Sequence, residues 1–261
     1  MVKLAPDQYP AAHALYIRNE AYFPLIAAVL TGEQDGVVHA DRQENTTQVF
    51  VEHAFGFAQV FGTPVPTFER DLQRYLLVDK AFSCSKVRLY TPHWPGFLQV
   101  SECEGLYSWR QHFQLDITRT GTAGHATEGL KKGLELVHAD ASHVDLIEDA
   151  FGVVGRFWRT PNDFVHHSNA VVALVAGQAA AICYAAAIAG GRAEIDVLTL
   201  PAYRHLGLAK AVVSVFNRQC LAQNVLPLWD CFTNNTASLA LCRSAGFIPL
   251  GDAYPFFTIS R

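Results

Sequence analysis

The chain has 261 residues, of which 50% are hydrophobic and 17% charged, and its formal net charge at pH 7 is −4. This composition supports a sizeable folded core and argues against a disordered chain. The slight acidic excess argues against a nucleic-acid-binding protein, which normally presents a basic face. The six cysteines show no CxxC pair and no regular spacing, which favours reduced thiols in a cytoplasmic protein.

The first half of the chain contains alternating helical and extended patterns, and its N-terminus lacks the apolar stretch of a signal peptide. Helices are expected over residues 6–16, 23–30 and 67–77, and extended segments over residues 36–41, 48–62, 87–94 and 97–102. The small, polar, glycine-rich stretch from Thr118 to Gly129 is typical of a linker. We therefore expect an N-terminal α/β domain over residues 1–125 and a second domain over residues 126–261.

The uncharged stretch from Ala170 to Gly191 is long enough to cross a bilayer. Its many alanines contribute little transfer energy, and Gly177-Gln178 interrupts it where a turn would sit. Two buried strands joined as a hairpin are the preferred interpretation, and no membrane association is expected.

The second half alternates more clearly between strands and helices. Strands are expected over residues 134–140, 170–191 (as the hairpin), 192–200, 226–232 and 247–259, and helices over residues 141–152, 207–223 and 234–246. Asp140 or Ser142 could cap the first helix, and Asn234 or Asn235 the last, before Gly246. The fold class is α/β (α+β), a mixed sheet flanked by helices, preceded by a smaller N-terminal domain with a similar helix-then-hairpin order that suggests a decayed duplication.

The junction between residues 199 and 213 passes from a strand into a helix with no polar loop between them. The first N–H groups of such a helix have no partner within it and form an anion site. Gly207 and Ala209 leave room for a phosphate, and Arg204 offers donors to it. The alternative is an ordinary tight turn that exposes an arginine.

Two motifs decide between these interpretations. Pro201, Tyr203, Arg204, Gly207 and Ala209 match the pattern P-x-Y-R-x-x-G-x-A, and a later motif comprises Asn235, Ser238, Leu241, Cys242, Gly246 and Phe247. Together they resemble the two motifs of the GNAT acyltransferase superfamily, most closely the branch that contains the zwittermicin A self-resistance acetyltransferase. The resemblance is specific over the C-terminal half and weak over the N-terminal half.

The resemblance implies that acetyl-CoA is the acyl donor and that no metal takes part. The pyrophosphate would lie on the loop formed by Arg204, His205, Leu206, Gly207, Leu208 and Ala209. The pantetheine arm would run beside the strand residues Val197, Leu198 and Thr199, as an added strand would. Asn235 would contact a pantetheine amide, or would only cap its helix.

Acyl transfer to an amine needs a base and an acid. Glu194 and Asp196 lie on the pantetheine strand and are candidate bases, or simply solvent-facing acids. The family often places a catalytic tyrosine where this chain has Cys242, so the acid is assigned instead to Tyr254 or to water. Tyr254 could equally be a packing residue, and Cys242 a small core residue.

The resulting expectation is an N-acetyltransferase that modifies the primary amine of a small molecule. The alternatives are a protein amine as acceptor and a non-catalytic acyl-CoA-binding module. Thiol catalysis by Cys231 and metal binding by His166-His167 lack supporting signatures. The aromatic residues of the N-terminal half could build the acceptor pocket or only fill that half's own core, and the oligomeric state, including a homodimer, stays open.

Overall fold

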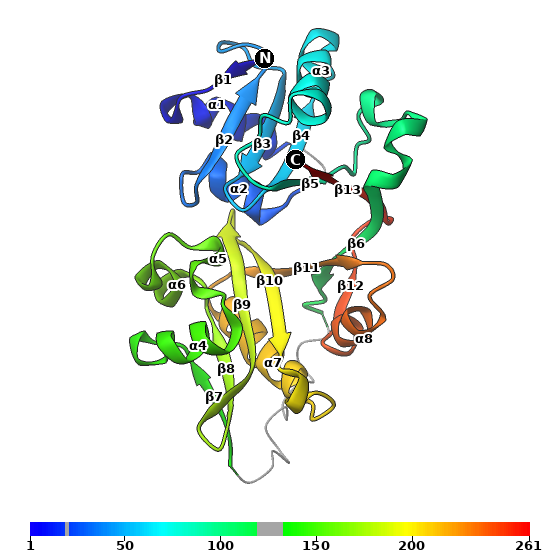
Figure 1. Ribbon diagram of the computed structural model, residues 1–261. Coiled ribbons are helices and arrows are strands. Elements are labelled where there is room, and N and C mark those ends of the chain that lie inside the picture. The colour runs from blue at the N-terminus through cyan, green and yellow to red at the C-terminus, as the bar shows by residue number, and fades with distance from the viewer. Residues whose placement is uncertain (19–20, 119–132) are drawn as a thin grey trace. The chain divides into compact units, whose positions relative to one another are not determined.

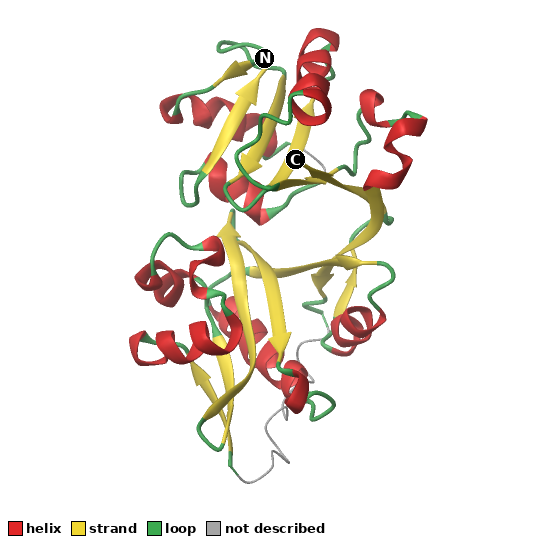
Figure 2. Ribbon diagram, viewed as in Figure 1, coloured by secondary structure: helices red, strands yellow, loops and turns green. Residues whose placement is uncertain are grey.

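The computed structural model describes residues 1–18, 21–118 and 133–261 (Figures 1 and 2). The chain divides into two compact units: unit 1 comprises residues 1–110 and 253–261, and unit 2 comprises residues 111–252. The predicted boundary near residue 125 and most of the predicted linker lie outside the described residues.

Unit 1 is a mixed sheet with helices. Its elements are β1 (Val2–Lys3), α1 (Tyr9–Tyr16), α2 (Pro24–Leu30), β2 (Gly36–Ala40), β3 (Gln48–His53), β4 (Phe57–Gly62), α3 (Pro66–Gln73), β5 (Lys86–Tyr90), the first part of β6 (Tyr107–Leu115) and β13 (Tyr254–Ser260). The strands pair in the order β1-β2-β3-β4-β5-β13-β6. All these pairs are antiparallel except β4 with β5, which is parallel.

Unit 2 repeats this arrangement. Its elements are the second part of β6, β7 (Leu134–His138), α4 (Val144–Phe151), α5 (Val154–Phe157), α6 (Pro161–His167), β8 (Val171–Val175), β9 (Gln178–Ala189), β10 (Arg192–Thr199), α7 (Leu208–Ala222), β11 (Leu226–Phe232), α8 (Thr236–Ser244) and β12 (Phe247–Pro249). The order is β7-β8-β9-β10-β11-β6, with β12 also on β6, and β10 is parallel to β11.

Two apolar clusters cover the two faces of the sheet in unit 2. On one face the strands pack on α7, through residues such as Val212 and Phe216. On the other face they pack on α4 to α6, through Ile147 and Phe164. All four of these side chains are fully buried, so the sheet is a central layer, as the mixed α/β prediction requires.

Most predicted elements of unit 2 are confirmed. The stretch from Ala170 to Gly191 forms β8 and β9, joined by a turn at Ala176-Gly177, and no helix among the described residues is long and apolar enough to cross a membrane. Asn235 caps α8, its side chain accepting a bond from the Ser238 N–H at 3.1 Å, and Gly246 follows the helix at φ +88°.

Some expectations for unit 1 are wrong. The segment 97–102 is not extended: residues 96–98 and 101–106 form short 3₁₀-helices. The sequence patterns also missed β1 and β6. Residues 107–110 of β6 belong to unit 1 and residues 111–115 to unit 2, whereas β13, which follows unit 2 in the chain, pairs with β5 in unit 1.

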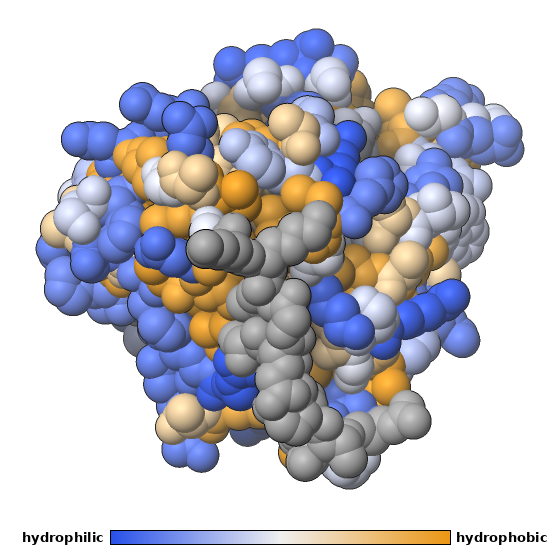
Figure 3. All heavy atoms as spheres, turned by 90° about the horizontal axis from the view of Figure 1, so that it is seen from below, coloured by the Kyte–Doolittle hydropathy of each residue, from blue (hydrophilic) through white to orange (hydrophobic). Residues whose placement is uncertain are grey.

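Some of the apolar side chains lie at the surface. In the view of Figure 3, apolar side chains gather around the middle of the face and polar side chains surround them. More than half of a folded protein's surface is normally apolar, so this patch alone indicates no partner.

Candidate functional site

The strand β10 leaves its neighbour β11 halfway along its length. The two strands pair only from Arg192 to Glu194, opposite Leu226 to Leu228, while β10 continues to Thr199 and β11 to Phe232. On its other edge β10 stays paired with β9 up to Thr199. The backbone of residues 195–199 therefore has one open edge, which Figure 1 shows as the divergence of β10 and β11.

The predicted pantetheine residues lie on this open segment. Val197, Leu198 and Thr199 are all half-buried. Their side chains alternate between the two faces of the sheet, since Val197 packs in the cluster on α7 and Leu198 in the cluster on α4 to α6. An extended arm added at the open edge would continue the sheet.

A tight turn connects β10 to α7. A 3₁₀ turn from Pro201 to Tyr203 ends β10, and Arg204 is again extended. His205 and Gly207 both have positive φ, +62° and +78°. Residues 204–207 are all exposed, so this loop, the predicted pyrophosphate cradle, is accessible.

Gly207 caps α7, a helix of 15 residues. The first intrahelical bond runs from the Ala211 N–H to the Gly207 carbonyl at 3.1 Å, so the N–H groups before Ala211 have no partner in the helix. A Cβ on Gly207 would meet no atom within 4 Å, so the space beside it is open. The positive φ gives a second reason for glycine that the sequence did not reveal.

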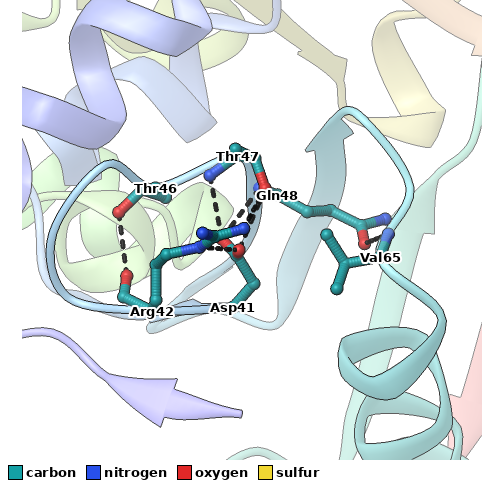
Figure 4. Close-up of polar contacts among 6 residues, drawn as sticks. All are labelled: Asp41, Arg42, Thr46, Thr47, Gln48 and Val65. Carbon is teal, nitrogen blue, oxygen red and sulfur yellow. Dashed lines mark hydrogen bonds and ion pairs between the residues drawn. The ribbon is translucent and has the colours of Figure 1, made fainter.

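The corresponding junction in unit 1, between β4 and α3, is built differently. There α3 begins at Pro66, which has no N–H, and the Val65 N–H donates to Gln48 Oε1 at 2.7 Å. Gln48 is itself fixed, because its backbone N–H donates to Asp41 Oδ1 at 3.0 Å (Figure 4). The start of α3 therefore differs from the predicted anion site of unit 2, because it lacks an N–H at Pro66 and its Val65 N–H is already bonded.

The two candidate bases lie in different surroundings. Glu194 is 7% exposed. The Asp196 side chain is 32% exposed and accepts bonds on Oδ2 from Tyr184 at 2.6 Å and from Arg156 Nη1 at 3.3 Å. Burial and the neighbouring Asp196 charge raise the pKa of Tyr184 far above its usual value, so its hydroxyl stays protonated and donates to Asp196. Arg156 and Tyr184 are the residues that the sequence analysis missed at this site.

The candidate acids are both buried. Cys242 is fully buried among residues such as Trp229 and Phe247, and burial raises the pKa of its thiol to about 12. Tyr254 is 6% exposed and belongs to unit 1, where its ring packs on Phe23 with a centroid distance of 5.7 Å. The role of Tyr254 in proton transfer stays a prediction.

The remaining sequence candidates have structural partners. Cys231 is a buried residue of β11, and His166 Nδ1 contacts the Asn162 carbonyl oxygen at 2.8 Å. His167 stacks on Trp158. Among the residues that the structure describes, no group of His, Cys, Asp and Glu is arranged to hold a metal ion.

The aromatic residues of unit 1 divide between core and surface. Phe57 stacks on Tyr90 within the core of the unit. Trp94 and Tyr107 instead line a cavity of about 290 Å³, together with Leu98, Gln99, Val100, Ser101 and Glu104. Unit 1 therefore has an aromatic-walled cavity of its own.

The chain belongs to the GNAT acetyltransferase family, whose model matches residues 17–257. This confirms the predicted enzyme class, a GNAT-type acyltransferase. The chain is also similar to an uncharacterised N-acetyltransferase, YdfB, of Bacillus subtilis strain 168, with 31% identity over 121 residues. That match spans 45% of this chain and 46% of the relative, so it covers less than half the length of that curated protein.

Solved structures resemble the whole chain. A GCN5-related N-acetyltransferase-like protein of Streptococcus suis 89/1591 covers 98% of this chain and 99% of its own, with 19% identity and a TM-score of 0.72. A tandem GNAT protein from the clavulanic acid biosynthesis pathway covers 99% of this chain and 97% of its own, with 14% identity and a TM-score of 0.61. These likenesses confirm the GNAT-like mixed α/β fold.

Proposed function

We propose that the protein is an acetyl-CoA-dependent N-acetyltransferase that modifies the primary amine of a small molecule. The observation that carries the proposal is the open edge of β10 leading directly into the glycine-capped N-terminus of α7. We also assign the chain to the branch of the family that contains the zwittermicin A self-resistance acetyltransferase, on the motifs in residues 194–247, and to the cytoplasm, on its free thiols.

The residues present fit acetyl-CoA. The loop from Arg204 to Ala209, exposed over residues 204–207, supplies N–H donors and the positive end of the α7 dipole to the pyrophosphate, and the Arg204 guanidinium adds charge. The open edge of residues 195–199 pairs with the pantetheine amides. The exposed Asn235 lies at the start of α8, where its side-chain amide keeps one donor for the same arm.

Bound in this way, acetyl-CoA supplies an activated acetyl group. Glu194 or Asp196 takes the proton of the acceptor ammonium, directly or through water. A backbone N–H on the open segment of β10 donates to the carbonyl oxygen as it becomes negative. Tyr254 or water returns a proton to the departing thiolate.

The role of unit 1, in acceptor binding or in stabilising the fold, stays a prediction, and its own aromatic cavity is the candidate for the binding role. The support is the aromatic cavity that Trp94 and Tyr107 line, because small-molecule pockets favour aromatic walls. The competing role is that unit 1 only stabilises the fold. Trp94→Ala should raise KM for the amine and leave the acetyl-CoA dissociation constant unchanged; an unchanged KM supports the purely structural role.

A thiol-release assay tests the proposed function. The full chain is mixed with acetyl-CoA and a panel of small primary amines, and free CoA thiol is followed together with the mass of the amine. We expect a mass increase of one acetyl group in at least one amine. Binding of acetyl-CoA with no thiol release from any small amine or amine-bearing peptide indicates a non-catalytic module, and release with peptides alone indicates a protein acceptor.

A further inference from the structure

Three polar side chains from different elements meet beside the open edge of β10. Asp196 projects from β10, Tyr184 from β9 and Arg156 from α5. Asp196 lies two residues beyond Glu194, the last residue that pairs with β11. The cluster therefore sits where the sheet opens, on the face that α4 to α6 cover.

The position of Arg156 is fixed by its neighbours in the chain. The indole N–H of Trp158 donates to the Ala185 carbonyl at 3.1 Å, at the irregularity where β9 loses register with β10. The start of α5 is held by Glu148, whose Oε2 accepts from the Val154 N–H at 2.8 Å. Hydrogen bonds thus fix both ends of this short helix, and they position Arg156 next to Asp196.

The hydrogen bonds within the cluster reach only one of the two carboxylate oxygens of Asp196. Tyr184 and Arg156 both donate to Oδ2 of Asp196, and within the described ranges no residue donates a hydrogen bond to Oδ1. Arg156 uses only Nη1 toward Asp196, and its side chain is 27% exposed, against 32% for Asp196. The pair is therefore partly exposed, and one of the two carboxylate oxygens has no hydrogen-bond donor among the described residues.

We propose that Asp196 and Arg156 form the acceptor subsite and that it takes an amine carrying a carboxylate on a neighbouring carbon, as in an amino acid. This rests on the proposed acetyltransferase function and names its substrate class. Oδ1 of Asp196 binds the ammonium, and the free guanidinium nitrogens bind the carboxylate, for which arginine's geometry is suited. A second cationic group near the amine would meet the Arg156 charge, so polyamines are disfavoured.

The reaction at this subsite balances without a further reactant. Asp196 Oδ1 takes one proton from the ammonium, and the freed nitrogen lone pair forms a bond to the acetyl carbonyl carbon. The carbon–sulfur bond breaks and its electrons leave with the sulfur. The nitrogen, positively charged after the attack, loses a second proton, and one proton reaches the thiolate from an acid or from water, so that the products are a neutral amide and a free thiol. Tyr184 touches no reacting atom in this scheme and is a positioning residue for Asp196.

Matched pairs of acceptors test the proposal: glycine with methylamine, β-alanine with ethylamine, phenylalanine with phenethylamine, and lysine with cadaverine, plus spermidine. Thiol release gives kcat and KM for each, and calorimetry gives acetyl-CoA binding. In each accepted pair, we expect kcat/KM to be at least about tenfold higher for the carboxylated amine than for its partner. The reason is that only the carboxylated amine forms charged hydrogen bonds with Arg156. If no amine and no peptide is accepted, the proposed function itself fails.

Substitutions test which residue causes the preference for amines that carry a carboxylate. Arg156→Gln should remove the preference for the carboxylate mainly through KM, Arg156→Lys should restore part of it, and the exposed Arg218→Gln should change nothing. Tyr184→Phe should lower kcat about tenfold and keep the preference. Equal kcat/KM within the pairs, or a preference that survives Arg156→Gln with acetyl-CoA binding intact, would overturn the proposal.

Discussion

Glu194 and Asp196 on β10 are the two candidates for the general base, and their surroundings differ. A base must reach the ammonium or a water that does so. The Asp196 side chain is 32% exposed, and Tyr184 and Arg156 donate to only one of its oxygens, whereas Glu194 is 7% exposed. Access to the acceptor therefore favours Asp196.

The isosteric substitution Asp196→Asn should lower kcat by about 10²–10⁴-fold, the usual loss of a general base. Glu194→Gln should have a smaller effect. Steady-state kinetics check both, and calorimetry should find unchanged acetyl-CoA affinity in both variants. A larger loss from Glu194→Gln would transfer the role to Glu194, and full activity in both would place the base elsewhere.

Cys242 stands where the family often has a catalytic tyrosine, and the structure gives it a packing role. It is fully buried, and burial raises the pKa of its thiol to about 12. Cys242→Ala should keep kcat unchanged and lower the free energy of unfolding by about 1 kcal/mol, because a small buried side chain is trimmed. Urea denaturation and thiol release measure the two effects. A tenfold fall in kcat without a loss of acetyl-CoA binding would instead give the thiol a part in the reaction.

At the scale of elements, β6 and β13 each pair with strands that are distant in the sequence. β13 follows unit 2 in sequence but pairs with β5 in unit 1, from Phe256 opposite Tyr90 to Ser260 opposite Lys86. Residues 113–115 of β6 follow unit 1 but pair with β12 in unit 2. A fragment that begins after residue 125 would lack that strand, so each unit needs residues from both halves of the chain.

The stability of unit 1 should therefore depend on the C-terminal strand. Phe257 is fully buried and packs in the same cluster as Phe82 and Leu89. Phe257→Ala should lower the free energy of unfolding by about 3–5 kcal/mol. The exposed Ser260→Ala on the same strand is the control and should cost little. Equal stability of the two variants in urea would show that β13 does not support unit 1.

Elements with strong periodicity were predictable from the sequence, and short or register-dependent features were not. The helix over residues 207–223 and the hairpin of β8 and β9 were predicted because their apolar patterns are long. Helix α5, with 4 residues, is too short to show a period. The missed strand β6 does alternate apolar and polar residues from Tyr107 to Leu115, and that signal was available.

The candidate site also has parts that the sequence predicts and parts that it does not. The loop from Arg204 to Ala209 is local, so a motif could predict it. The contact between Arg156 and Asp196 spans 40 residues and depends on where β9 and β10 lose register, which no local pattern encodes. Tyr184, a polar-tipped side chain within the alanine-rich strand β9, was the one visible hint of a buried polar partner.

At the scale of the whole molecule, the two units repeat one topology but not one site. β1 to β5 in unit 1 and β7 to β11 in unit 2 have the same order and the same parallel last pair. This agrees with an internal duplication in which unit 1 is a degenerate GNAT-like half. The junction before α7 is capped by Gly207, whereas at the junction before α3 Pro66 has no N–H and Gln48 accepts the Val65 N–H.

A calorimetric titration of the full chain with acetyl-CoA tests the central claim most directly. We predict one site per chain, and a dissociation constant at least about tenfold weaker in Gly207→Val, equivalent to about 1.4 kcal/mol, because the branched side chain is strained at positive φ and enters the cradle. Gly177→Val is the matched control: Gly177 has the same φ of +78° and the same open surroundings, but lies in the turn between β8 and β9. Its affinity should equal that of the wild type. Two sites per chain, or full affinity in a folded Gly207→Val variant, would contradict the assignment of the α7 N-terminus as the acetyl-CoA site.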